Sequence, residues 1–131
     1  MRTAAIRGTG SALPELEIGN QAFEAFLDTD DAWIRERTGI VTRRLAVTET
    51  TSELAILAAK RALEDAGAAG LDVDLILTAT SSPDTIFPSV SCQVQAAVGA
   101  EHAAAFDVNA ACSGFLTALS TAWAYIRCGM A

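Results

Sequence analysis

The chain has few charged residues, and their balance does not favour a polyanionic partner. Only 19% of its 131 residues are Asp, Glu, Lys or Arg, and nine basic side chains against sixteen acidic ones give a net charge of −7. This balance argues against a nucleic-acid partner and provides no basic patch for an anionic membrane. Apolar residues make up 51% of the chain, which is enough for a hydrophobic core in one domain spanning residues 1–131.

Residues that could build a metal centre or a disulfide framework are also scarce. Cysteine occurs three times, and this odd number without paired spacing predicts reduced thiols. The sole histidine, His102, has no carboxylate placed beside it by the sequence, so we expect a surface residue rather than a catalytic base. No metal-ligand cluster, phosphate-binding P-loop or Gly-x-Ser-x-Gly turn is present, and we predict no metal site.

Long hydrophobic runs are missing as well. No apolar stretch approaches the length needed to cross a bilayer, and the first residues lack the apolar region of a signal peptide. Together with the reduced thiols, this predicts a cytoplasmic protein without a membrane partner.

The hydrophobic pattern predicts alternating strands and helices. Short or continuous apolar runs indicate strands at 3–7, 75–80 and 104–108, and we interpret Gly8-Thr9-Gly10 as a turn. Caps and helical spacing indicate a helix over residues 20–27, with Asn20 as its cap and Phe26 and Leu27 facing inward, and a second helix that follows the acidic caps at 28–31 and stops at Gly39. A capping box of Thr50 and Glu53 opens a third helix, which runs to about residue 66, ends at Gly67 and carries Arg61 and Asp65 on its solvated face. Two further helices are indicated over residues 90–98 and 112–128. This alternation is typical of βαβ units, so we predict an α/β fold whose mostly parallel sheet is covered by helices on both faces.

A tryptophan and an arginine share one face of the second predicted helix. Trp33 and Arg37 lie at positions i and i+4, where an indole beside a guanidinium could stack a base and hold a phosphate. The spacing alone is more typical of a core tryptophan whose edge is covered by the arginine. We interpret the adjacent pair Arg43 and Arg44, later in the chain, as a solvated surface pair.

One of the three cysteines, Cys112, lies at a predicted strand-to-helix turn. Cys112 follows the apolar run 104–108 and stands where the helix begins, among the unpaired N–H groups of its first turn. Such a position favours a thiolate, the nucleophilic form of cysteine. A small buried hydrophobe that lets strand and helix approach closely is an equally good interpretation of the position alone.

Four sequence motifs together resemble the β-ketoacyl-acyl-carrier-protein synthase III family of the thiolase superfamily. They occur in family order over nearly the whole chain, and the opening Ile6-Arg7-Gly8-Thr9-Gly10 with Leu13-Pro14 is the loosest of them. The others are Asp28-Thr29-Asp30-Asp31-Ala32-Trp33-Ile34-x-x-Arg37-Thr38-Gly39-Ile40, Phe87-Pro88-Ser89 and Phe106-Asp107-Val108-x-Ala110-Ala111-Cys112-Ser113-Gly114-Phe115.

The resemblance implies roles for five residues. Cys112 would be the catalytic nucleophile that takes the acyl group from acyl-CoA, with its own N–H as an oxyanion donor. Thr29, Trp33 and Arg37 would bind coenzyme A at its adenine and phosphates. Phe87 would reach across a homodimer into the partner's acyl pocket. Coenzyme A thioester would be a substrate, acyl-carrier protein a partner, and no resident cofactor is implied.

The resemblance also implies a longer enzyme. Members of the family are more than twice this length, and nothing here matches the catalytic His and Asn of their second half. We therefore expect residues 1–131 to be the N-terminal part of a thiolase-like fold, an incomplete first half of its duplicated architecture, and to be inactive alone. The expected parent reaction is acyl-CoA-primed decarboxylative condensation with malonyl-acyl-carrier protein. The alternatives are a non-condensing acyltransferase and a non-catalytic subunit for dimerisation or coenzyme A binding.

Overall fold

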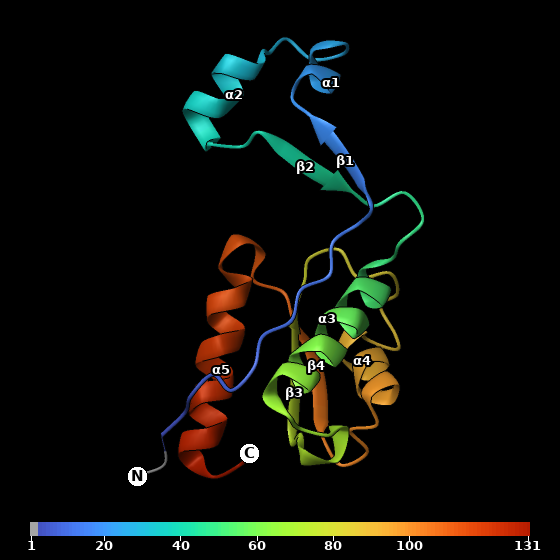
Figure 1. Ribbon diagram of the computed structural model, residues 1–131. Helices are drawn as coiled ribbons and strands as arrows, with labels where there is room; N and C mark the ends of the chain where they lie inside the picture. Colours follow the sequence, from blue (N-terminus) through green and yellow to red (C-terminus); the bar gives the residue numbers. More distant parts are fainter. Residues whose placement is uncertain (1–2) are drawn as a thin grey trace. The chain divides into compact units, whose positions relative to one another are not determined.

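Figure 1 shows the computed structural model of the chain, which describes residues 3–131. The chain divides into two compact units. The smaller unit is Leu13–Glu49, and the larger unit combines the N-terminal residues through Ala12 with Thr50–Ala131. Each unit contains its own two-stranded sheet.

The larger unit is a parallel strand pair with helices packed against it. Its elements are α3 (Thr51–Ala66), β3 (Leu75–Ala79), α4 (Val90–Val98), β4 (Ala104–Val108) and α5 (Gly114–Cys128), with 3-10 turns at Gly70–Asp72 and Ala111–Ser113. Strands β3 and β4 pair in parallel, with Leu77 opposite Phe106. Helix α4 packs on both strands and on α3, whereas α5 packs mainly on β3. In Figure 1, α5 and α4 lie on opposite sides of the strand pair.

Helix boundaries in this unit follow the predicted caps. Thr50 and Glu53 form the expected capping box, in which the Thr50 N–H donates to the Glu53 carboxylate over 2.8 Å. Gly67 ends α3 in the left-handed conformation, with φ 61°, and Gly99 and Gly129 end α4 and α5 in the same way. The predicted βαβ alternation and the parallel pairing of 75–80 with 104–108 are confirmed.

The first predicted strand and the predicted glycine turn are wrong. Residues 3–10 form no strand, and Gly8 and Gly10 instead lie against the backbone of α3. A Cβ atom on Gly8 would stand 2.5 Å from the carbonyl oxygen of Ala62, so glycine is required there for close approach of two backbones. The segment is held by charged side chains that we expected to be solvated, because Asp65 accepts the Thr9 N–H over 2.8 Å and Arg61 donates to the Ser11 carbonyl.

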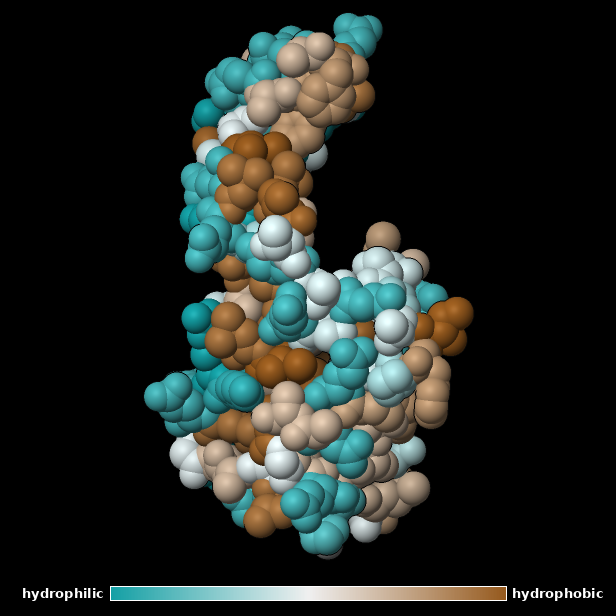
Figure 2. Space-filling model, turned by 90° about the vertical axis from the view of Figure 1, so that its right-hand side faces the viewer, coloured by the Kyte–Doolittle hydropathy of each residue, from teal (hydrophilic) through white to brown (hydrophobic). Residues whose placement is uncertain are grey.

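The core formed by the described residues is small. In the larger unit its buried apolar side chains are Val90, Val94, Ala100, Ala103 and Ala118, and in the smaller unit Ile34 is buried. Helices lie on both faces of the strand pair as predicted, but they cover it only in part, because Phe106 on β4 is 37% exposed although its ring lies 6.4 Å from that of Tyr125 on α5. No further strand pairs with β3 or β4 among residues 3–131. Figure 2 accordingly shows apolar residues on the molecular surface, interspersed with hydrophilic ones.

The smaller unit contains two strands that the sequence pattern did not predict. Strands β1 (Leu16–Gly19) and β2 (Thr42–Leu45) pair antiparallel, and the helices α1 (Gln21–Glu24) and α2 (Asp31–Thr38) lie between them in the chain. Arg44 on β2 forms a 2.7 Å ion pair with Glu17 on β1. Four-residue strands carrying charged side chains lack the period-two apolar signal, which explains why they escaped prediction. The predicted helix 20–27 is shorter, and Phe26 and Leu27 are exposed rather than facing inward.

Glu49 is the last residue of the smaller unit, and its side chain accepts hydrogen bonds that depend on pH. Its carboxylate accepts the N–H groups of Glu15, Val47 and Thr48 at 3.1–3.2 Å. Hydrogen bonds from its own backbone N–H, and then from these three, lower the pKa of Glu49 to about 2. Because the folded pKa is depressed, the stabilisation is present above the ordinary value near 4.5 and is lost as the pH falls towards 2.

We therefore expect the Glu49 carboxyl carbon to titrate near pH 2 in an NMR pH series of the folded protein. Over pH 4.5 to 2 the amides of Glu15, Val47 and Thr48 should lose protection from exchange. Glu49→Gln serves as the control, since an amide has no proton to gain in this range and the same amides should show less pH dependence. A midpoint at the ordinary value of a glutamate would contradict the hydrogen bonding.

Among residues 3–131, no three His, Cys, Asp or Glu side chains are grouped closely enough to hold a metal ion. Within the same residues, no helix has the length and apolar character required to cross a membrane.

Candidate functional site

Cys112 lies in a sharp turn between the end of β4 and the start of α5. The 3-10 turn Ala111–Ser113 carries it, and the α-helix proper begins two residues later at Gly114. The Ser113 hydroxyl donates to the Ala110 carbonyl over 2.8 Å and closes the turn. The predicted strand-to-helix position of Cys112 is thus confirmed. Its side chain is exposed, which contradicts the interpretation as a small buried hydrophobe.

The residue before Cys112 has an unusual backbone conformation. Ala111 has φ 43°, and among the described residues it is the only non-glycine residue with positive φ. The left-handed region costs an alanine roughly 1–2 kcal/mol, because its Cβ comes too close to the following carbonyl. Strain of this kind is concentrated at functional sites, where it orients a reactive side chain. Here it turns the chain immediately before the thiol.

Close packing at the start of α5 holds this turn against β3. Gly114 is buried, and a Cβ atom built on it would stand 3.3 Å from the Cβ of Ala79 at the end of β3. This contact is tighter than almost all real Cβ contacts, so a larger residue at position 114 would require Ala79 or the first turn of α5 to shift. Glycine is therefore used here to bring helix and strand together.

An apolar groove of about 710 Å³ runs beside this turn. It is lined on one side by α5 from Gly114 to Ile126 and on its floor by every residue of β3. Alternate residues of a strand point to opposite faces, so a lining of consecutive residues marks the unpaired edge of β3. This edge exposes backbone N–H and C=O groups, which an acyl chain cannot satisfy. We therefore do not assign the groove to an acyl group.

A buried polar network fixes the strand that leads to Cys112. The Asp107 carboxylate accepts the N–H groups of Val90 and Ser91 at 3.0 and 2.8 Å, at the N-terminus of α4. Ser91 is fully buried, and its hydroxyl oxygen accepts the Thr78 N–H over 2.9 Å. The network joins β3, β4 and α4. The sequence analysis missed Asp107, although a lone acid in the apolar run 104–108 was an available signal.

The other two cysteines have different surroundings. Cys92 is half-buried on α4, with its sulfur 3.9 Å from the Ala105 carbonyl oxygen. Cys128 is exposed at the last position of α5, at the negative end of the helix dipole. All three cysteines are free thiols, as the odd count predicted.

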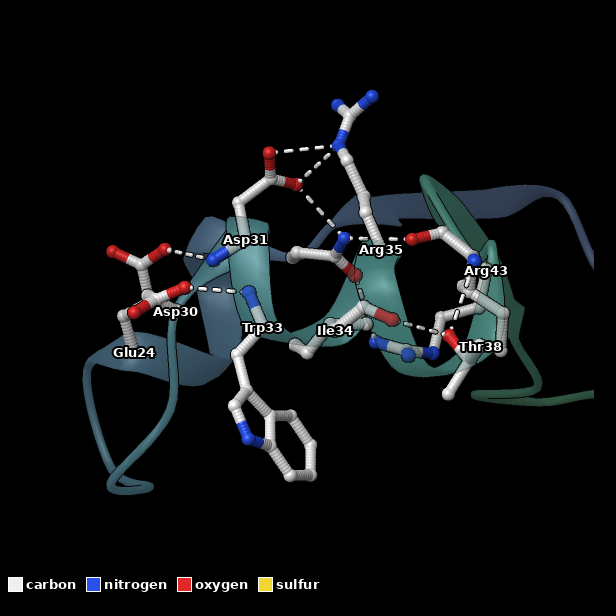
Figure 3. A network of polar contacts seen from close by, with 10 residues as sticks. Glu24, Asp30, Asp31, Trp33, Ile34, Arg35, Thr38 and Arg43 are labelled. Carbon is white, nitrogen blue, oxygen red and sulfur yellow. Dashed lines mark hydrogen bonds and ion pairs between the residues drawn. The ribbon is translucent and has the colours of Figure 1, made fainter.

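A second candidate site lies in the smaller unit, around α2. Trp33 is 53% exposed, so it is not the core tryptophan that its spacing alone suggested. The Arg37 guanidinium carbon lies 5.6 Å from the centre of the Trp33 ring. Asp30 caps the helix by accepting the Trp33 N–H over 2.7 Å, as Figure 3 shows. The cap fixes the first turn of α2 and thereby the position from which the indole projects.

Trp33 also lines a hollow of about 480 Å³ with Phe23, Leu27, Asp28, Thr29, Ile34 and Arg43. The hydroxyl oxygen of Thr29 is buried there and has no hydrogen-bond partner. A buried hydroxyl without a partner is costly, so an external hydrogen-bonding group is the natural complement. Thr29 and Trp33, predicted from the resemblance, thus line one hollow, and Arg37 lies beside it on the Trp33 ring.

A network of polar contacts joins α2 to its neighbours in the smaller unit (Figure 3). Asn20 is fully buried, and its amide donates to Asp31 and to the Ile40 carbonyl, both over 2.8 Å. It makes no helix-capping bond, contrary to expectation. Arg43 donates to the Asn20 side-chain oxygen over 3.3 Å and lies 4.5 Å above the Phe23 ring. The predicted solvated role of Arg43 is therefore wrong.

Hydrogen bonding from Arg35, followed by that from Asn20, lowers the pKa of Asp31.

The remaining predicted site residue, Phe87, belongs to the larger unit. It lies on the loop between β3 and α4 and is 87% exposed. His102 is exposed in the turn before β4, as predicted.

Solved structures of known enzymes are similar to most of the chain. It aligns with 3-oxoacyl-[acyl-carrier-protein] synthase III from Aquifex aeolicus VF5 at a TM-score of 0.90 and 46% identity, over 95% of this chain and 40% of that one. With the priming β-ketosynthase of the R1128 polyketide biosynthetic pathway the TM-score is 0.89, at 36% identity over 95% of this chain and 37% of that one. The mixed α/β fold therefore matches 37–40% of the chains of these two ketosynthases.

The sequence comparisons narrow the class to one family. The family model of 3-oxoacyl-[acyl-carrier-protein] synthase III matches residues 106–131, from the end of β4 through the Cys112 turn and α5. β-Ketoacyl-[acyl-carrier-protein] synthase III 1 of Bacillus anthracis is 51% identical over 95% of this chain and 40% of its own length. The chain belongs to the β-ketoacyl-acyl-carrier-protein synthase III family and spans about 40% of the length of these relatives.

Proposed function

We propose that the chain is the N-terminal part of a thiolase-fold condensing enzyme that primes fatty-acid or polyketide synthesis. The observation that carries the proposal is the exposed Cys112, held after a left-handed alanine at the N-terminus of α5. An exposed thiol is open to a bulky thioester, and the partial positive charge of the helix N-terminus lies close to where negative charge develops in the reaction. Family membership supplies the reaction that such a thiol serves.

In the proposed first half-reaction, the Cys112 sulfur attacks the carbonyl carbon of acyl-CoA. A carbon–sulfur bond forms to Cys112, the bond to the coenzyme A sulfur breaks, and coenzyme A leaves as a thiolate that takes up a proton. In this proposal the N–H of Cys112 donates a hydrogen bond to the oxyanion of the tetrahedral intermediate. The product of this step is an acyl thioester on Cys112.

In the second half-reaction, malonyl-acyl-carrier protein loses carbon dioxide, and the resulting carbanion attacks the acyl-cysteine carbonyl. The Cys112 thiolate leaves and β-ketoacyl-acyl-carrier protein is formed. The catalytic His and Asn that serve this step in the family have no match in residues 1–131. We therefore infer that the chain alone does not condense, and that these groups come from the rest of the enzyme.

Coenzyme A is proposed to bind at α2 in the smaller unit. The flat, half-exposed Trp33 ring offers a stacking surface for adenine, and Arg37 beside it a cation for phosphate. The unpaired Thr29 hydroxyl supports hydrogen bonding to the adenine end. Coenzyme A enters as a substrate thioester, and no resident cofactor is required by this chemistry.

The proposed partners are acyl-carrier protein and a second copy of the enzyme. The exposed Phe87 supports a homodimer in which its ring enters the partner's acyl pocket. The reaction uses soluble thioesters, which is consistent with a cytoplasmic location, and neither nucleic acid nor a membrane has a role in it.

Incubation of the full-length protein with an acyl-CoA and radiolabelled malonyl-acyl-carrier protein tests the proposal. We expect malonyl-dependent β-ketoacyl product and release of carbon dioxide. Acyl groups exchanged without a malonyl requirement would identify a non-condensing acyltransferase. Coenzyme A binding with no acylation of Cys112 would identify a non-catalytic subunit, and either result would overturn the condensing function.

A further inference from the structure

The loop between β3 and α4 presents two large apolar side chains to solvent. Ile86 is 94% exposed and Phe87 is 87% exposed, the two highest values among the exposed large hydrophobic residues. Exposing such side chains is unfavourable, because each would gain roughly 1.5–3 kcal/mol if fully buried. A flexible loop would be free to fold them onto the protein surface. The contacts on either side of the pair show why this loop does not.

The first anchor is Asp84, whose carboxylate caps the N-terminus of α3. One oxygen accepts the Thr51 N–H over 2.8 Å, and the other accepts the Ser52 N–H over 2.6 Å and the Ser52 hydroxyl. The Thr51 hydroxyl donates in return to the Ser82 carbonyl of the loop. The Ser52 hydroxyl and then the Ser52 N–H lower the pKa of Asp84, so the carboxylate remains charged at the positive end of the helix.

The second anchor lies on the other side of the apolar pair. The Thr85 hydroxyl donates to the Pro88 carbonyl over 2.8 Å, which closes the loop around Ile86 and Phe87. Gln93 on α4 donates to the same carbonyl over 3.3 Å. The apolar pair is therefore held between a cap on α3 and a contact from α4, and both helices are regular and packed against each other.

We propose that Asp84 is a positioning residue that holds Ile86 and Phe87 in the conformation in which they enter an apolar pocket of a second copy of the enzyme. This inference rests on the proposed function, in which Phe87 bounds the partner's acyl pocket. A side chain already fixed in its bound conformation loses little entropy on insertion, so anchoring the loop strengthens the dimer contact. The anchored loop also fixes the depth of the partner's acyl pocket, which the Phe87 ring closes.

Acyl-chain selectivity should consequently depend on Asp84, although Asp84 never touches the acyl group. In Asp84→Asn, an amide NH2 group replaces one carboxylate oxygen and faces backbone donors at the start of α3. One capping hydrogen bond is then lost, the loop gains freedom, and the Phe87 ring is no longer held at one depth. We expect the ratio of kcat/KM for acetyl-CoA to kcat/KM for hexanoyl-CoA to fall by about tenfold, the scale on which pocket size discriminates between apolar groups.

The measurement is the ratio of kcat/KM for the two primers in the full-length protein. Asp72→Asn is the matched control, because Asp72 also caps a turn, by accepting the Ala69 N–H over 2.8 Å, but lies outside this loop. Its primer ratio should remain unchanged. Ser52→Ala removes a single contact to Asp84 and should shift the ratio in the same direction by less, so it provides a test if Asp84→Asn does not fold.

A double-mutant cycle with Phe87→Ala separates positioning from general destabilisation. If Asp84 acts through Phe87, Asp84→Asn should not change the primer ratio further in the Phe87→Ala background. An unchanged ratio in Asp84→Asn, or the same shift with and without Phe87, would overturn the inference. Absence of malonyl-dependent product in the unsubstituted protein would instead overturn the proposed function, so the two failures are distinguishable.

Discussion

Replacing Cys112 with alanine is expected to abolish acylation of the full-length protein by acyl-CoA. Removal of a catalytic nucleophile deprives the reaction of its covalent intermediate, and losses on the order of 10⁴-fold or more in kcat are typical for residues that act in this way. The protein should keep its fold, because the Cys112 side chain is exposed and alanine is tolerated in a 3-10 turn. Binding of coenzyme A should therefore be retained while acyl transfer is lost.

The remaining cysteines provide internal controls for this assignment. Cys92 is half-buried on α4, whereas Cys128 is exposed at the C-terminal end of α5, at the negative end of the helix dipole. Cys112 combines exposure with the N-terminal end of the same helix. Exposure alone would label Cys112 and Cys128 equally, so preferential labelling of Cys112 reports its local electrostatics rather than its accessibility.

Peptide mapping after limiting iodoacetamide near pH 7 measures that preference. We expect label on Cys112 first, protection of Cys112 by acyl-CoA, and radiolabel from acyl-CoA on the same peptide. Cys92→Ala and Cys128→Ala should keep acyl transfer close to that of the unsubstituted protein. Equal labelling of the three thiols, or acyl label on Cys92 or Cys128, would remove Cys112 from the role of nucleophile.

Replacing Trp33 with alanine is expected to weaken coenzyme A binding with little effect on folding. The Trp33 side chain is 53% exposed, so about half of its surface is open to contact with a ligand. Stacking of a base on an aromatic side chain contributes roughly 1–3 kcal/mol, which corresponds to a loss of about 5- to 160-fold in affinity. Calorimetric titration of the full-length protein with coenzyme A measures the change directly.

Arg37→Ala should weaken binding more strongly at low salt than at high salt, because a phosphate contact at the surface is screened by ions. The larger unit contains a matched control pair. Arg127 lies over the ring of Trp123 at 5.0 Å on α5, with Trp123 51% exposed. Trp123→Ala and Arg127→Ala should leave coenzyme A affinity unchanged. If Trp33→Ala binds as tightly as the unsubstituted protein, the stacking role of Trp33 is wrong.

Interactions between residues that are close in the sequence determined much of the secondary structure of this protein. The Thr50–Glu53 capping box and Gly67 predicted the two ends of α3, because caps satisfy backbone groups within one or two turns of the same helix. The apolar runs 75–80 and 104–108 predicted the parallel pair β3 and β4. The turn that holds Cys112 was evident in the same way, since it depends on small residues between a strand and a helix that are adjacent in the chain.

Only the tertiary structure decided the features that join distant parts of the chain. Gly8 and Gly10 looked like a turn because their requirement for glycine comes from the α3 backbone, more than 45 residues away. Asp84 caps a helix that begins 33 residues before it, and Asp107 caps one that begins 17 residues before it. A side chain with such a distant partner leaves no periodic or neighbouring signal.

The candidate coenzyme A site combines both kinds of information. The sequence placed Trp33 and Arg37 on one face of α2, because i and i+4 positions are neighbours on any helix. The spacing alone favoured burial of Trp33, whereas the fold leaves the ring half exposed beside a hollow that Arg43 and Thr29 help to line. Which residues share a helix face follows from helical geometry, but which face meets solvent depends on what the rest of the chain covers.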